Sequence, residues 1–288
     1  TRYSKDAVSQ YNFKEENIMV VQHNLSAMNT NRQMGVVTSA LQKSTEKLSS
    51  GYKINRAGDD AAGLSISEKM RSQIRGLNKA SDNAQDGISL IQVAEGALNE
   101  THSILQRMNE LATQAANDTN TSVDRQSIKD EIEQLNEELD RISTTTQFNK
   151  QDLLTGGFSG KLQVGALKGQ TMDVKISLAV SAKGLNVSAV EVSTNAKAGA
   201  AMQSIQDAIE SVSKQRSKLG AIQNRLEHTI NNLDTNAENT QAAESRIRDT
   251  DMADEMVQYS KNNILSQAGQ SMLAQANQQT QGVLSLLG

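Results

Sequence analysis

The chain has 288 residues, 36% of them hydrophobic and 2% aromatic, and it contains neither cysteine nor proline. The lack of cysteine excludes disulfides, thiolate metal sites and a cysteine nucleophile, and the lack of proline lets a helix run uninterrupted over many turns. The 29 basic and 33 acidic residues give a net charge of -4 with interspersed signs, which argues against a nucleic-acid-binding protein. No apolar run reaches the roughly 18 residues of a membrane span, so we expect no membrane insertion.

Residues 1–18 differ from the rest of the chain, because they show no apolar periodicity and hold three of the seven aromatic residues. They also lack the apolar core of a cleavable signal peptide. Back-translation of the run from Lys14 to Met19 contains a purine-rich ribosome-binding sequence shortly before a start codon. We therefore expect residues 1–18 to be a non-native or untranslated leader and translation to start at Met19, with an authentic disordered leader as the alternative.

A single apolar stripe at helical spacing runs along each end of the chain, from Met19 to about Ser49 and from Ala253 to Leu287. The residues of the two stripes are Val21, Leu25, Met28, Val37, Leu41 and Leu48, and Met256, Ile264, Leu265, Met272, Val283 and Leu287. So narrow a stripe does not stabilise an isolated helix, so each terminal helix must pair with the other, with another chain, or with both. Copies stacked head to tail by an operation that does not close would form an open fibre.

Heptad-like apolar stripes, among whose residues are Leu98, Leu105 and Leu111, predict helices over residues 63–143 and 198–235. Gly51 ends the first terminal stripe, and the acidic pair Asp59-Asp60 supplies the N-cap of the next helix. The sequence therefore predicts a mainly α protein, a long coiled-coil-like helical bundle whose terminal helices pair and whose middle carries a small β-hairpin element.

That β element is predicted over residues 148–193, where the apolar period changes to two. Alternating apolar residues on both sides of Lys168–Gln170 predict a β-hairpin with its turn at those residues. A further short strand is expected at Val187–Val192. The glycine-rich run Gly156–Gly160 lacks the Gly-Lys-Ser/Thr ending of a phosphate-binding loop, so it is predicted to be a turn.

Signals for catalysis are weak throughout the chain. The three histidines, His23, His102 and His228, are scattered, and none belongs to a His-Glu-x-x-His zinc motif. Paired acidic residues lie in cap or helix-surface contexts, where solvated charge explains them better than general acid–base chemistry. The sequence therefore predicts no catalytic, cofactor or metal site, and a protein that is not an enzyme.

The order of the motifs resembles that of the bacterial flagellins from Met19 to Gly288. The resemblance rests on ordered blocks, among them VVQHNLSAMNTNRQMG from Val20, EKLSSGYKINRAGDDAAGLSISEKM from Glu46, LQRMNELATQAAN from Leu105, TQFNKQDLLTG from Thr146, LGAIQNRLEHTINNL from Leu219 and SRIRDTDMADEM from Ser245. Only Phe148 to about Lys197 stands where the family carries its variable outer domains. The chain is thus similar to a short flagellin with a minimal variable region.

The resemblance implies a structural subunit that polymerises with copies of itself into the extracellular flagellar filament, exported unfolded through a type III channel without a cleavable signal. Residues 19–62 would form the N-terminal inner coiled-coil arm and a linker, residues 247–288 the C-terminal inner arm, and residues 63–246 the surrounding rod domain. Export chaperone, filament cap and hook-junction proteins are the implied partners, with no cofactor. A flagellar hook-filament junction protein is the alternative, and an enzyme displayed on the filament would need a catalytic insertion that the sequence lacks.

The resemblance also implies a surface patch that vertebrate Toll-like flagellin receptors recognise. The matching residues are Gln106, Arg107, Glu110, Leu111 and Gln114, with Glu131 on the following helix. The alternative is that this face packs against a neighbouring subunit, and in the family the two surfaces overlap.

Overall fold

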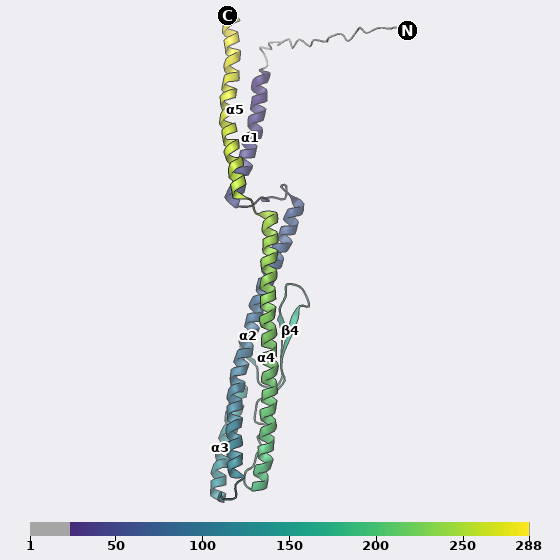
Figure 1. The fold of residues 1–288 in the computed structure, drawn as a ribbon, viewed down its shortest axis with the longest axis vertical. Helices are drawn as coiled ribbons and strands as arrows, with labels where there is room; N and C mark the ends of the chain where they lie inside the picture. The colour runs from purple at the N-terminus through teal and green to yellow at the C-terminus, as the bar shows by residue number, and fades with distance from the viewer. Residues whose placement is uncertain (1–23, 288) are drawn as a thin grey trace, which may run out of the picture. The chain divides into compact units, whose positions relative to one another are not determined.

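A computed structural model describes residues 24–287, with side chains through residue 279. The expected leader, the expected start at Met19 and the stripe residue Val21 lie outside the described residues. The described helices are α1 (Leu25–Ser50), α2 (Ala61–Ala115), α3 (Ser122–Thr145), α4 (Asn195–Arg248) and α5 (Met252–Leu287), and the strands are β1 (Gln147–Phe148), β2 (Gln151–Asp152), β3 (Phe158–Gln163) and β4 (Thr171–Ile176). The predicted fold class, mainly α with paired terminal helices and a small β element, is confirmed (Figure 1).

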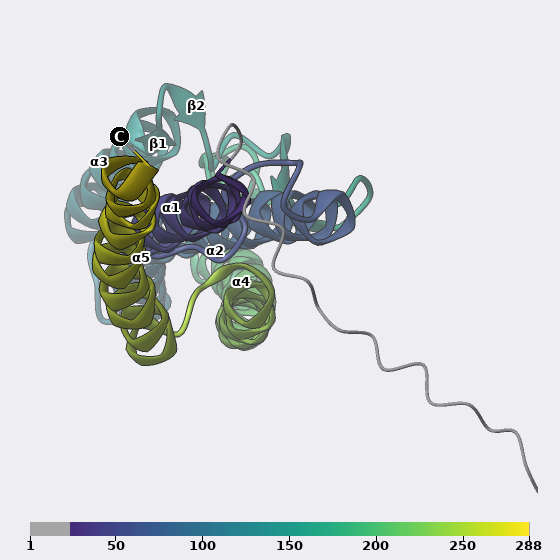
Figure 2. The same ribbon diagram turned by 90° about the horizontal axis from the view of Figure 1, so that it is seen from above.

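The chain divides into two compact units. The terminal unit consists of the residues up to Leu64 and from Ile247 onward, and the central unit consists of Ser65–Arg246. In the terminal unit α1 and α5 run side by side, as both ribbon views show (Figures 1 and 2). They are antiparallel, because the Asn24 Nδ2 donates to the Ala276 carbonyl oxygen at 2.9 Å near one end and Lys47 pairs with Glu255 at 3.2 Å near the other.

Local signals fix the ends of α1 and the start of α2. The Asn24 side chain accepts from the Ala27 N–H and caps the start of α1, while Gly51 ends it in the left-handed region at φ 76°, where glycine carries no steric penalty. The Asp60 carboxylate accepts from the Gly63 N–H at 2.9 Å, as expected of a cap. Hydrogen bonds from the backbone N–H groups of Arg56 and Asn55 hold the pKa of Asp59 below its ordinary value.

The core of the central unit lies between α2, α3 and α4, where the predicted heptad stripes meet. Its largest fully buried side chains on these helices are Ile91, Leu98, Leu105, Met108, Leu111, Ile132, Leu139, Ile205 and Leu219. The helix predicted at 198–235 is longer in the structure, Asn195–Arg248, because its polar last turns continue past the end of the apolar pattern. In Figure 1 these three helices run alongside one another.

The predicted hairpin is present as β3 and β4, which pair antiparallel with Leu162 opposite Met172. Every second residue of β4, namely Met172, Val174 and Ile176, is buried. Two α2 glycines make room for the hairpin: a Cβ on Gly87 would overlap the Leu162 side chain, and a Cβ on Gly76 would lie 2.9 Å from the Ala166 Cβ.

One local prediction in the β element was wrong, a second was confirmed only in part, and one strand pair was not predicted. Val187–Val192 forms turns rather than a strand, because Val187 and Val192 anchor the loop in the core without alternating between two faces. The run Gly156–Gly160 is only partly a turn, since β3 already begins at Phe158. The β1–β2 pair was not predicted, because its short polar strands carry no apolar alternation.

Candidate functional site

The interface between α1 and α5 combines small and polar side chains with partly buried apolar ones. Ser44 and Ala276 are the buried residues of α1 and of the described part of α5. Gly269 lies against Met34, with 3.9 Å between the Met34 Cγ and the position of a Cβ on the glycine. The predicted stripe residues Val37, Leu41 and Leu48 are partly buried. Only some of the residues in the two predicted stripes are therefore buried between α1 and α5.

A polar groove remains along this pair. It has a volume of about 450 Å³ and is lined by Ala40, Lys43, Ser44 and Lys47 of α1 and by Asp254, Glu255, Gln258 and Asn262 of α5. The Lys47–Glu255 ion pair is the best shielded contact there, since the Glu255 side chain is only 12% exposed. Paired charges of both signs leave this groove without the apolar lining of a small-molecule site.

Most of the large apolar side chains predicted for the two stripes point away from the pair. Leu25 is 67% exposed, Met28 64%, Ile264 67% and Met272 58%, and Met256 and Leu265 are exposed as well. The side chains of Val283 and Leu287, like Val21, lie outside the described residues. The pair therefore presents an exposed apolar surface, which we call the arm surface and define as Leu25, Met28, Met256, Ile264, Leu265 and Met272.

Sequence reasoning missed three further exposed apolar residues on these helices. Val36, Met252 and Val257 are 62%, 48% and 66% exposed. Val36 is next to Val37 in the sequence, and Val257 is next to Met256. In each of these two apolar pairs, only one residue was assigned to a predicted stripe. That doubling was the available signal for an apolar arc wider than a single stripe.

The second candidate surface lies on α2 and α3 of the central unit. The Arg107 Nε donates to Glu131 at 2.9 Å, and its Nη1 donates to Glu110 at 3.2 Å, so one guanidinium joins the two helices. These bonds, the one to Glu131 first, hold the pKa of Arg107 above its ordinary value. The ion pairs are solvent-exposed, so they orient the side chains more than they stabilise the fold.

The other predicted residues of this patch divide between surface and core. Gln106 and Gln114 are exposed, and the Gln106 amide lies 3.0 Å from the His102 Nε2. Leu111, by contrast, is 2% exposed and belongs to the core. The surface patch on α2 and α3 therefore consists of Gln106, Arg107, Glu110, Gln114 and Glu131.

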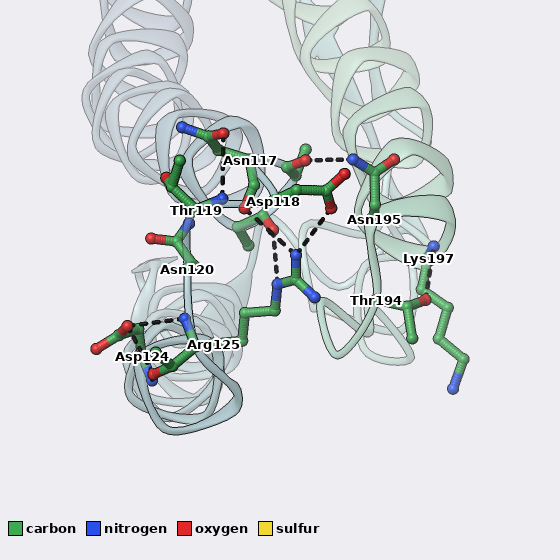
Figure 3. Close-up of polar contacts among 12 residues, drawn as sticks. Asn117, Asp118, Thr119, Asn120, Asp124, Arg125, Thr194, Asn195 and Lys197 are labelled. Atoms are coloured by element: carbon green, nitrogen blue, oxygen red, sulfur yellow. Dashed lines mark hydrogen bonds and ion pairs between the residues drawn. The ribbon is translucent and has the colours of Figure 1, made fainter.

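The turn between α2 and α3 holds these two helices in register (Figure 3). Arg125 donates to the carbonyl oxygens of Ala115 at 3.1 Å and Asn117 at 3.3 Å, and it pairs with Asp118 at 3.3 Å (Figure 3). The Asn195 amide donates to the Ala116 carbonyl oxygen, which ties the start of α4 to the same turn. These donors satisfy carbonyl groups that the end of α2 leaves without helical partners.

A capping box starts α3 on the other side of that turn. Thr121 and Asp124 exchange side-chain and backbone hydrogen bonds, the Thr121 N–H donating to the Asp124 carboxylate at 2.9 Å. Bonds from the Thr121 hydroxyl and N–H lower the pKa of Asp124. Both ends of the turn are thus fixed by side chains, which places Arg107 on α2 opposite Glu131 on α3.

Neither candidate surface carries signs of a catalytic or membrane site. Across the part of the chain that the structure describes, no group of histidine and acidic side chains could hold a metal ion. Among the described helices, none has an apolar stretch long enough to cross a membrane.

The chain is similar to known proteins over most of its length. Residues 21–159 match the bacterial flagellin N-terminal helical region, and residues 202–287 match the bacterial flagellin C-terminal helical region. A flagellin of Halalkalibacterium halodurans is 56% identical over 271 residues, covering 93% of this chain and 100% of that protein. A flagellin of Bacillus subtilis is 51% identical over 304 residues, with coverage of 93% and 100%. The crystal structure of Bacillus cereus flagellin, 34% identical, covers 57% of this chain and 94% of that chain with a TM-score of 0.48.

Proposed function

The chain belongs to the bacterial flagellin family and is a structural subunit of the extracellular flagellar filament, not an enzyme, and on that premise we propose which surfaces build the filament. The paired α1 and α5 form the inner layer, where the arm surface packs against neighbouring copies. The central unit, Ser65–Arg246, forms the surrounding wall.

The observation that carries this proposal is the exposure of the arm surface. Apolar side chains such as Ile264 and Met272 stay exposed although α1 and α5 are already paired. Exposed apolar surface is typical of interaction sites on soluble proteins. The exposed apolar side chains that the α1–α5 contact leaves uncovered favour a pair that is completed by other copies of the chain.

The test removes apolar area from the arm surface without touching the α1–α5 contact. Full burial of a large aliphatic side chain is worth roughly 1.5–3 kcal/mol, so burying the exposed part of Ile264 and Met272 contributes about 1–2 kcal/mol each. The double variant Ile264→Gln/Met272→Gln should therefore raise the critical concentration for assembly roughly 30- to 700-fold. Sedimentation of assembled protein over a concentration series measures that value.

The matched control is Val123→Gln, since Val123 is 72% exposed but lies in the first turn of α3 in the central unit. We expect its critical concentration to stay close to that of the unaltered chain. Circular dichroism of both monomers should be unchanged, because every replaced side chain is already exposed. Equal assembly by the arm-surface variant and the unaltered chain would exclude the arm surface as an assembly contact.

The finer parts of the proposal concern export and partners. We propose that the chain leaves the cell unfolded through a type III channel, which its lack of cysteine favours. An export chaperone, the filament cap and hook-junction proteins are the proposed partners besides other copies. Electron microscopy of the polymerised protein separates this role from that of a hook-filament junction protein, which would give short capped assemblies in place of filaments.

As a second function we propose that the surface patch on α2 and α3 is a ligand of Toll-like flagellin receptors. The supporting observation is that Arg107, Glu110 and Glu131 form one exposed, hydrogen-bonded group across two helices. A charged interface contact can contribute on the order of 2 kcal/mol when it becomes desolvated. Arg107→Ala should therefore weaken binding to a soluble receptor ectodomain about 30-fold, converted at about 1.4 kcal/mol per tenfold change.

The control for receptor binding is Arg141→Ala, which removes another exposed arginine that pairs with an acidic residue of its own helix. Its affinity should match that of the unaltered chain. Identical affinity for the Arg107 and Arg141 variants would exclude the patch as a receptor contact.

A further inference from the structure

The oxidisable side chains of this protein are unevenly distributed. The chain has no cysteine and no tryptophan but ten methionines, so thioether oxidation is its main route of damage by peroxides. Met28, Met252, Met256 and Met272 are 64%, 48%, 50% and 58% exposed, and all four lie on α1 or α5. In the central unit, Met108 and Met172 are 0% and 8% exposed.

The remaining described methionines, Met34, Met70 and Met202, are partly buried. Every methionine of the described residues that is about half exposed or more therefore lies in the terminal unit. Two of them lie at the same level of the α1–α5 pair. Because Asn24 contacts Ala276, Met28 and Met272 are each one helical turn from that contact, at the same level of the antiparallel helices.

We propose that Met28, Met252, Met256 and Met272 are oxidation sites for hydroperoxides, and that their oxidation makes the unassembled subunit incompetent for assembly. The proposal rests on the function proposed above, in which Met28, Met256 and Met272 of the arm surface become buried between copies, and it extends that burial to Met252, which lies one helical turn before Met256. Each sulfur attacks a peroxide oxygen, the O–O bond breaks, and the thioether becomes a sulfoxide while the peroxide leaves as water or an alcohol. The thioether is oxidised and the peroxide is reduced.

The sulfoxide changes the chemistry of the arm surface. It replaces a flexible apolar group by a polar, chiral one whose oxygen needs a hydrogen-bond donor. The apolar side chains of the arm surface, such as Ile264 and Leu265, carry no hydrogen-bond donor. An acceptor buried without a partner weakens association by at least about tenfold for each sulfoxide. Assembled subunits are protected, because peroxide no longer reaches the buried sulfur atoms.

The experiment treats purified monomer and assembled filament with dilute hydrogen peroxide and maps the added oxygen by peptide mass spectrometry. In the monomer the four exposed methionines should oxidise first, the partly buried ones later, and Met108 and Met172 last. In the filament the four should be strongly protected. Preferential oxidation of Met108 or Met172, or equal oxidation of the four sites in monomer and filament, would overturn the proposal.

Assembly is measured on the same samples as the ratio of critical concentrations after and before treatment. The ratio should rise at least about tenfold for the unaltered chain. It should stay near one for the variant Met28→Leu/Met252→Leu/Met256→Leu/Met272→Leu, because leucine is apolar and is not oxidised. Met108→Leu/Met172→Leu, the matched control in the core, should stay as sensitive as the unaltered chain. A quadruple variant that is equally sensitive would contradict the proposal.

Reduction of the methionine sulfoxides in peroxide-treated monomer gives an independent test. Methionine sulfoxide reductases of both stereochemical classes, supplied with a dithiol that is oxidised to a disulfide, should restore assembly, and persistent loss after complete reduction would contradict the proposal. The untreated Ile264→Gln variant separates the oxidation sites from the proposed function, since isoleucine has no sulfur. Normal assembly of the Ile264→Gln variant would count against the proposed function. If instead this variant fails to assemble, but the unaltered chain still assembles after peroxide treatment, the result would count against the oxidation sites alone.

Discussion

Replacement of Gly87 by alanine should disturb the contact between α2 and the hairpin, whereas the same replacement at Gly96 on the same helix should not. A Cβ on Gly87 would overlap the Leu162 side chain of β3 and lie 3.4 Å from the Leu226 Cδ1 of α4. A Cβ on Gly96 meets nothing within 4 Å. The two substitutions are thus the same and lie on the same helix, but they differ in the atoms that the added Cβ would meet.

The two substitutions should change the free energy of unfolding in opposite directions or by clearly different amounts. Alanine in place of a helical glycine stabilises by about 0.8–1.0 kcal/mol, which Gly96→Ala should show in full. At Gly87 the same gain is opposed by overpacking against Leu162, which costs typically about 1–3 kcal/mol. The gap between the two variants is then about 1–3 kcal/mol, or about 2–4 °C in Tm per kcal/mol for a domain of this size.

Thermal unfolding of the full-length monomer, followed by circular dichroism, measures this gap. Gly96→Ala should unfold above the unaltered chain, and Gly87→Ala should unfold below Gly96→Ala. Equal transition temperatures for the two variants would show that the hairpin does not rest closely on Gly87, and would refute the packing argument.

Two further predictions concern the α2–α3 turn. Arg125→Ala removes charged donors from two carbonyl groups and should lower stability by roughly 1.5–3 kcal/mol in a thermal melt, whereas the exposed Arg141→Ala should change it by less than about 0.5 kcal/mol. Because the Thr121 bonds lower the pKa of Asp124, its capping box stabilises the fold above the ordinary aspartate pKa near 4 and is lost as the pH falls through the lowered value. The Tm difference between the unaltered chain and Asp124→Ala should therefore be constant near neutral pH and shrink on acidification below about pH 4. A Tm difference that grows on acidification would contradict the stabilising role of the ionised Asp124 carboxylate.

The elements that sequence reasoning predicted well are those whose side chains repeat. The heptad stripes that include Leu98 and Leu105 predicted the core helices, and alternation at Met172, Val174 and Ile176 predicted the hairpin, because burial on one face imposes the same period on sequence and structure. The β1–β2 pair has no such face. Its turn residues Asn149 and Lys150, at φ 48° and 62°, are set by local backbone geometry that the apolar pattern does not encode.

The candidate surfaces were harder to predict than the elements that carry them. The stripes indicated that α1 and α5 need partners, but not which apolar side chains the pair itself would bury. The pair buries Ser44 and Ala276 and partly buries Val37 and Leu41, whereas Ile264 and Met272 stay exposed. On α2, Leu111 belongs both to the receptor patch that the resemblance implies and to a heptad stripe. Only the packed structure shows that its side chain is buried in the core.

The central claim, that the arm surface is buried between copies, is tested most directly by a reconstruction of the assembled filament at side-chain resolution. We predict that Leu25, Met28, Met256, Ile264 and Met272 contact neighbouring subunits while the Lys47–Glu255 pair stays within one chain. A filament in which these apolar side chains face solvent, and in which subunits meet only through the central unit, would contradict it.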